Sequence, residues 1–210
     1  MYTKILQEEM VSAFGCTEPI ALALAACRAA EVLAKKLDHI IVYCSGNMIK
    51  NAKSVIVPGT NGKKGIEISV VLGAIAGDCK KGLEVLNGID SSYVTEAEKL
   101  IASGICKVVL EPDIPGLYIK VEVFSGEQSA SVTVTDSHTH VTEIMKDGKR
   151  IFKNEDSRAD QENTSEMSFK DIYEYADTTD LSEMIPILDR EIQYNMAIAD
   201  EGLKGNWGSN

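Results

Sequence analysis

The sequence has no closely spaced cysteine pair and no long apolar run. Its five cysteines stand far apart, so no C-x-x-C motif for zinc or an iron–sulfur cluster is present, and we expect no metal site in this chain. Their odd number and wide spacing argue against a disulfide framework, and we expect Cys27, Cys79 and Cys106 to be packing residues. No stretch reaches the roughly 18 apolar residues that a membrane span needs.

A signal peptide and a basic stripe are also missing. Residues 1–15 carry three charged side chains and lack a long apolar core, which predicts a cytoplasmic protein with no membrane contact. Residues 1–153 hold 18 acidic and 17 basic side chains, whereas residues 154–210 hold 14 acidic and 4 basic ones. Nearly all of the net charge of −11 therefore lies in the last quarter of the chain. Without a basic stripe, nucleic acid is excluded as a partner.

What is present is the pattern of an α+β protein. Residues 20–37 and 66–76 read as helices rich in small residues and apolar on more than one face, so we expect them to be buried and closely packed. Residues 40–44 form a β-branched run typical of a buried strand, and residues 48–53 a polar connector. From residue 105 the apolar period changes to two, which predicts an antiparallel sheet with strands at 106–110, 118–123, 130–134, 141–144 and 149–153.

The last quarter of the chain differs from the rest. We expect an α+β domain over residues 1–153, then a mobile linker at 154–166, because that acidic stretch has no apolar anchor. Residues 167–210 form a helical segment. Its apolar stripe needs a partner surface and consists of Leu181, Ile185, Leu188, Ile192 and Met196.

The stretch GCTEP at residues 15–19 opens the first long helix. Pro19 is tolerated in the first turn, so Cys16 stands just ahead of the helix N-terminus. Free amides and the helix dipole favour a thiolate there, which predicts a lowered pKa for Cys16. The alternative, with about equal weight, is that Gly-Cys is only a tight entry into a core helix.

A second candidate is the glycine-rich basic loop of residues 59–65, which leads directly into a helix. Free amides and the dipole at a helix start make such a loop an anion site. It lacks the G-x-x-x-x-G-K-[ST] spacing of a nucleotide-binding loop, and taken alone an ordinary turn is the commoner interpretation.

Five blocks of sequence together resemble one known family. They are GCTEPIA at 15–21, CSGNMIKNA at 44–52, VPGTNG with KGIE at 57–67, SHTHV at 137–141 and DREIQYN at 189–195. In order and spacing they are similar to the L-cysteine desulfidases, relatives of the iron–sulfur L-serine dehydratases. The resemblance implies a lyase that converts L-cysteine to pyruvate, hydrogen sulfide and ammonia, using a [4Fe–4S] cluster. Cysteine and serine both stay open as the preferred substrate.

The family's cluster ligands lie in a C-terminal half that these 210 residues do not contain. The resemblance therefore implies that this chain is the N-terminal half, without the cluster and inactive alone. It also implies that residues 181–199 contact the C-terminal half or a second copy of the chain.

Elimination of sulfide from an amino acid needs a base for the Cα proton and donors for the carboxylate. We expect Cys16 to be the base. The expected substrate-binding groups are Asn47, Lys50, Asn51, the backbone amides of Gly59, Thr60, Asn61 and Gly62, and, lining the pocket, His138 and Thr139. Cys44 receives no role. The competing hypothesis is a non-catalytic binding module for a small amino acid or anion.

Overall fold

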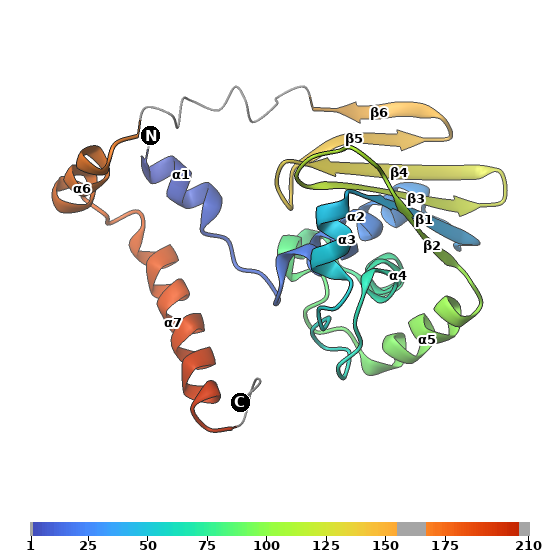
Figure 1. Ribbon diagram of the computed structural model, residues 1–210, viewed down its shortest axis with the longest axis horizontal. Coiled ribbons are helices and arrows are strands. Elements are labelled where there is room, and N and C mark those ends of the chain that lie inside the picture. The colour runs from blue at the N-terminus through green and yellow to red at the C-terminus, as the bar shows by residue number, and fades with distance from the viewer. Residues whose placement is uncertain (1, 155–166, 206–210) are drawn as a thin grey trace. The chain divides into compact units, whose positions relative to one another are not determined.

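The computed structural model describes residues 2–154 and 167–205, which form two compact units (Figure 1). The smaller unit groups Met1–Ser12 with Asp160–Asn210, and the larger unit is Ala13–Ala159. We describe each unit separately.

The larger unit is built on a six-stranded mixed sheet with strand order β2-β1-β3-β4-β5-β6. The strands are β1 (His39–Cys44), β2 (Cys106–Leu110), β3 (Tyr118–Ser125), β4 (Gln128–Thr135), β5 (Val141–Lys146) and β6 (Lys149–Lys153). Strand β1 pairs in parallel with β2, and every other neighbouring pair is antiparallel. Alternate residues of β3 are buried, as its period of two predicted.

The α+β class is thus confirmed, and one pairing departs from the expected purely antiparallel sheet. Strand β1 lies between β2 and β3 in the sheet. The chain passes through several helices after β1 before it returns as β2. A connection of that length permits a parallel pair, whereas the short turns after β3, β4 and β5 permit only antiparallel ones.

Two small-residue helices pack against each other and form the centre of the larger unit. They are α2 (Thr17–Leu33) and α4 (Ile66–Ala76), and α2 also packs on β3 and β4. Ala25 is fully buried. At Gly73 an added Cβ would lie 2.1 Å from the carbonyl oxygen of Ala23, so only glycine allows the two backbones to come this close. The close packing predicted from the small residues is confirmed.

Three shorter elements complete the larger unit. They are α3 (Gly46–Ala52), the 3-10 helix η1 (Cys79–Glu84) and α5 (Ser91–Ala102). The polar connector expected at residues 48–53 is instead helical, because Met48 and Ala52 are buried and anchor α3 to the core. Of the apolar run at 54–57, only Ile56 forms an isolated bridge, with Lys64.

A disulfide joins Cys27 of α2 to Cys79 at the start of η1. The expectation of no disulfide, with both residues as packing cysteines, is therefore wrong. The two residues are 52 positions apart, and the fold brings their Cα atoms to 5.9 Å, a separation that no local spacing in the sequence reveals.

The smaller unit contains α1 (Tyr2–Glu9), α6 (Phe169–Thr178) and α7 (Ile185–Gly202). Tyr175 joins α6 to α1. The Tyr175 hydroxyl lies 2.8 Å from Thr3 Oγ1, and the centres of the Tyr175 and Tyr2 rings are 5.1 Å apart. The structure thus groups α1 with the C-terminal helices. The linker predicted at residues 154–166 lies outside the described residues except for Asn154.

The apolar stripe of α7 remains largely exposed within this unit. The exposed fractions of Ile185, Ile192 and Met196 are 52%, 58% and 56%. Despite this apolar surface, no helix among residues 2–154 and 167–205 has the length and hydropathy to cross a membrane.

Candidate functional site

The candidate site begins at the N-terminus of α2, where Cys16 is the capping residue. Gly15 before it has a φ of +88°, and an added Cβ would lie 2.4 Å from Cγ of Pro58. Only glycine therefore lets this segment close against the loop that begins at Pro58. Phe14 also contacts this loop, since its ring lies 3.7 Å from the position of a Cβ on Gly59. These contacts hold the segment before α2 against the loop that begins at Pro58.

Glu18, in the first turn of α2, joins the groups of the site through its carboxylate. Its Oε2 accepts hydrogen bonds from Cys16 Sγ at 3.0 Å and from Thr17 Oγ1 at 3.3 Å. Its Oε1 accepts one from Asn51 Nδ2 at 3.1 Å, which connects α2 to α3. Glu18 was not among the predicted site residues although it lies inside the GCTEP block, because an acidic residue in a first helical turn is ordinarily explained by the helix dipole.

The carboxylate of Glu18 is stabilised in its charged form. Its pKa is lowered, chiefly because it accepts the hydrogen bond from Cys16, and further by Asn51 and by the positive field of His138. Glu18 is therefore ionised at neutral pH.

The thiol of Cys16 behaves in the opposite way to our expectation. Its pKa is raised, first by partial burial and then by its hydrogen bond to the Glu18 carboxylate. The backbone amides of Thr17 and Glu18 lower the pKa, as expected for a helix start, but the other two effects prevail. The predicted lowered pKa is wrong, because a carboxylate two residues further on counteracts the helix N-terminus.

Helix α3 presents three polar side chains on one face. All three are exposed, and Lys50 and Asn51 follow Asn47 by three and four positions, so each lies on the side of the helix that Asn47 occupies. Among the described residues, the side chains of Asn47 and Lys50 have no hydrogen-bond or ion-pair partner. Lys50 is thus a cation on the helix face from which Asn51 reaches Glu18.

The loop of residues 59–62 offers backbone amides. Within the described parts of the chain, none of these four amides donates a hydrogen bond. Thr60 is fully buried, and its hydroxyl donates to the carbonyl oxygens of Val57 at 2.5 Å and Lys63 at 3.3 Å. The side chain of Thr60 therefore holds the loop in shape, whereas Asn61 is exposed.

The turn between β4 and β5 supplies the last predicted residues. His138 is half-buried, and its electrostatic effect is the smallest of those that lower the pKa of Glu18. The ring of His140 holds this turn, with Nδ1 at 3.3 Å from the Thr135 carbonyl oxygen and Nε2 at 3.2 Å from Asn154 Nδ2. Thr139 is exposed, and its side chain makes no hydrogen bond to the other site residues in the described part of the chain. The fold thus brings Cys16 and Asn51 into hydrogen-bond contact with Glu18, and His138 acts on this carboxylate only through an electrostatic effect.

The described residues do not fit a [4Fe–4S] cluster, which needs several thiolates around one centre. The three free cysteines are Cys16, Cys44 and Cys106, on different elements, and burial raises the pKa of both Cys44 and Cys106 to about 12. Such thiols stay protonated. The structure thus offers this cluster no ligand set in the described part of the chain, and we derive no chemical step through it.

The sequence is similar to several bacterial proteins. It is 42% identical to the UPF0597 protein of Lachnoclostridium phytofermentans over all of this chain and 52% of the relative, and 40% identical to that of Finegoldia magna over 99% of this chain and 50% of the relative. It is 38% identical to UPF0597 protein YhaM of Salmonella newport over 97% of this chain and 48% of the relative. No family model matches, and no solved structure matches significantly.

The chain spans about half the length of the curated relatives it matches. The names of these relatives state no activity. The resemblance to L-cysteine desulfidases therefore stays a prediction.

Proposed function

We propose that this chain forms the amino-acid-binding half of a lyase that converts L-cysteine, or by the related reaction L-serine, to pyruvate. The observation that carries the proposal is the carboxylate of Glu18 held between the Cys16 thiol and Asn51. Lys50 precedes Asn51 on the same helix, and the loop that begins at Pro58 lies against Gly15. An α-amino acid needs such an arrangement, because it has a cation, an anion and an acidic proton on one carbon atom.

The two charged ends of the substrate have separate partners in this proposal. Glu18, ionised at neutral pH, binds the ammonium group. Lys50 and Asn47 donate to the α-carboxylate, together with the exposed amides of Gly59, Asn61 and Gly62. Opposite charges on the two sides fix the orientation of the substrate and leave its Cα proton facing the start of α2.

Cys16 is the proposed base, and substrate binding activates it. In the empty site its proton stays on sulfur, because the thiol donates to a carboxylate. When the substrate's ammonium group pairs with Glu18, it offsets that negative charge, so the pKa of the thiol falls and its proton passes to solvent. The thiolate then removes the Cα proton, and the C–H electron pair forms the Cα–Cβ double bond as HS⁻ leaves.

The product of this elimination is an enamine of pyruvate, which water converts to pyruvate and ammonia. The resemblance places the acceptor of the departing sulfur, a [4Fe–4S] cluster, outside this chain. We place the reaction in the cytoplasm, and we propose that a segment equivalent to the second half of the relatives, or a second copy of the chain, covers the apolar stripe of α7.

Calorimetric titration of the whole chain tests the binding step. We expect L-cysteine and L-serine to bind, and Glu18→Gln to abolish binding of both. 3-Mercaptopropionate, which lacks the ammonium group, should bind Glu18→Gln at least as well as the unaltered chain. Equal binding of acetate and L-serine by the unaltered chain would contradict the lyase proposal and favour the anion-binding module.

A turnover assay tests the chemistry. The chain is combined, without oxygen and with iron and sulfide, with the second half of the L. phytofermentans relative, and pyruvate and sulfide release from L-cysteine are measured. We expect release only when both halves are present. Binding of amino acids without any turnover in the combined protein would favour a binding module.

A further inference from the structure

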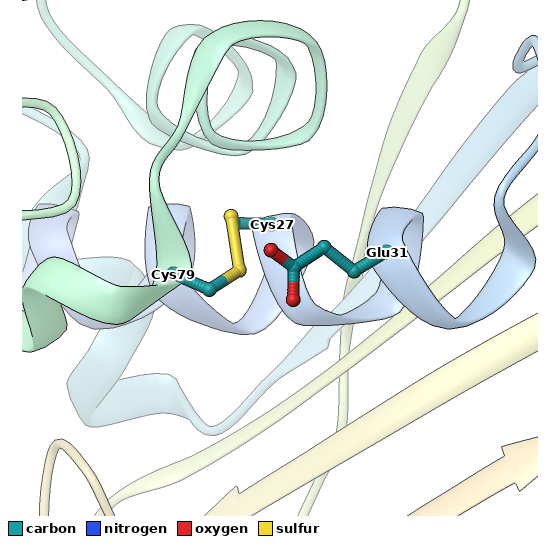
Figure 2. A group of neighbouring side chains, drawn as sticks. All are labelled: Cys27, Glu31 and Cys79. Atoms are coloured by element: carbon teal, nitrogen blue, oxygen red, sulfur yellow. A yellow bond between two sulfur atoms is a disulfide. The ribbon is translucent and has the colours of Figure 1, made fainter.

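We propose that Cys27, Glu31 and Cys79 form a second site, which binds a zinc-class divalent metal ion when the disulfide is reduced. The site uses none of the residues assigned to amino-acid binding. The ligand atoms of the three residues all lie within 4.8 Å of one another. Figure 2 shows the Glu31 carboxylate directed toward the two sulfur atoms.

The ligands come from two elements that the backbone holds together. Cys27 and Glu31 are four positions apart on α2, so they share one face of that helix. Cys79 is the first residue of η1. At Gly77, just before η1, an added Cβ would lie 2.6 Å from the Gly73 carbonyl oxygen and 3.1 Å from Cβ of Cys27. The backbone hydrogen bonds from Gly77 to Gly73 and from Asp78 to Val85 also hold this segment and do not involve the S–S bond, so we expect Cys79 to stay near Cys27 after reduction.

The charges of the neighbouring residues suit a bound cation with anionic ligands. Two thiolates and one carboxylate bring three negative charges, and a divalent ion leaves one of them uncompensated. Lys35 and Lys36 line the same surface depression as Cys27 and Glu31 and balance that charge. The depression opens Cys27 and Glu31 to solvent, although Cys79 does not line it, and so gives the ion an entry path. Water is the expected fourth ligand of a tetrahedral ion with three protein ligands.

The ligand set selects the kind of metal. Thiolates favour zinc, copper(I) and iron–sulfur centres over magnesium and calcium, and zinc accepts cysteine and carboxylate ligands in one tetrahedral site. A mixed set of two thiolates and one carboxylate therefore fits zinc.

Formation of the site requires a reductant of the dithiol class. The dithiol gives two electrons and two protons to the Cys27–Cys79 bond and becomes a disulfide itself, and the metal ion then displaces the two thiol protons. In the reducing cytoplasm, where we place the protein, such pairs are kept as thiols. The metal-bound state is then the cytoplasmic form, and the disulfide is the oxidised form.

Cobalt(II) is the probe for the test, because cobalt thiolates absorb light and zinc thiolates do not. The whole chain is reduced with a phosphine without oxygen and titrated with Co²⁺. We expect one equivalent to produce a thiolate-to-cobalt charge-transfer band, and zinc to abolish it. Cys79→Ser should lose the band, and the matched control Cys106→Ser should keep it.

Glu31→Gln supplies the second variant, because Glu31 is exposed and its replacement leaves the packing unchanged. We expect it to weaken cobalt binding by about tenfold or more. Absence of the band in the reduced unaltered chain, loss of it in Cys106→Ser, or unchanged affinity in Glu31→Gln would each overturn the three-ligand site. Circular dichroism checks that Cys79→Ser is folded, and if it is not, Glu31→Gln decides the question.

Discussion

At the scale of single residues, Glu18 governs the chemistry available at the start of α2. Its carboxylate accepts the thiol of Cys16 and the amide of Asn51, and so it keeps the thiol protonated while it stays charged itself. A thiol that is neutral until a cation arrives is protected from oxidation in the empty site, because only the thiolate reacts readily.

The first prediction concerns that coupling. In Glu18→Gln the negative charge is removed, so the thiolate of Cys16 becomes easier to form and its pKa falls. The rate of alkylation of Cys16 by iodoacetamide, followed by peptide mass spectrometry, should therefore rise at lower pH than in the unaltered chain. Glu96→Gln, an exposed change on α5, is the control and should leave the profile unmoved. An unchanged profile in Glu18→Gln would show that the carboxylate does not control the thiol.

A second prediction separates catalysis from binding. It is tested on the chain combined with the second half of the L. phytofermentans relative, as in the turnover assay. Cys16→Ser should keep the fold, since the two side chains are similar in size, and should lose most pyruvate release, because a hydroxyl is a far poorer base. Lys50→Ala should mainly raise KM, because it removes a charge-assisted contact to the carboxylate. Lys53→Ala, at the end of the same helix, is the control. Full activity of Cys16→Ser would remove the cysteine from the mechanism.

At the scale of secondary-structure elements, the crossing of α2 and α4 depends on the absence of side chains. Ala25 is fully buried on α2, so Ala25→Leu should overpack the core around that helix and lower the free energy of unfolding by about 1–3 kcal/mol. Gly73→Ala should destabilise the protein as well, because its Cβ would overlap the Ala23 carbonyl. Gly202→Ala in α7 meets no atom within 4 Å and is the control. Urea unfolding measures all three, and equal stability of Gly73→Ala and the unaltered chain would contradict the close crossing.

The elements also show how far the sequence leads. The period-two pattern predicted β3 and β4 because alternation is a local property, and small residues predicted the close helix pair for the same reason. The position of β1 inside the sheet and the pairing of Cys27 with Cys79 depend on contacts distant in sequence, and no local pattern carries them. Helix α3 was not predicted, because glycine and asparagine at positions 46 and 47 are typical of a turn. Burial of Met48 nevertheless stabilises the helix.

The candidate site was predictable in its parts and not in its chemistry. The sequence blocks pointed to Cys16 and Asn51, and the fold brings both residues to one carboxylate. The direction of the pKa shift of Cys16 was not predictable, because it depends on how the Glu18 side chain turns back toward the helix start. Thr60 was predicted to bind the substrate through its backbone amide. The structure shows that its hydroxyl donates to carbonyl oxygens of the same loop and so holds the loop in shape.

At the scale of the whole molecule, the exposed stripe of α7 predicts association. We expect the chain alone to self-associate as its concentration rises, because an exposed apolar surface of this kind marks an interface. Ile192→Glu should shift analytical ultracentrifugation profiles toward the monomer, and Glu191→Ala, at the neighbouring position, should not. A chain that stays monomeric at all concentrations would argue against a second copy as the partner, and addition of the second half of a relative then tests the other candidate.

The place of β1 in the sheet also has a consequence for how the protein folds. Strands β3 to β6 follow one another with short turns and can pair as soon as they meet, whereas the parallel β1–β2 pair must wait until the whole segment from α3 to α5 has closed into a loop. Pulse-labelled hydrogen exchange during refolding should therefore protect the amides of β4 before those of β2, and protection of both strands at the same rate would contradict this order. Strand β1 pairs with β3 across an even longer stretch of chain, so the docking of β1 between β2 and β3 is the slow step. During that delay the open edge of β3 is the surface most exposed to pairing with another chain.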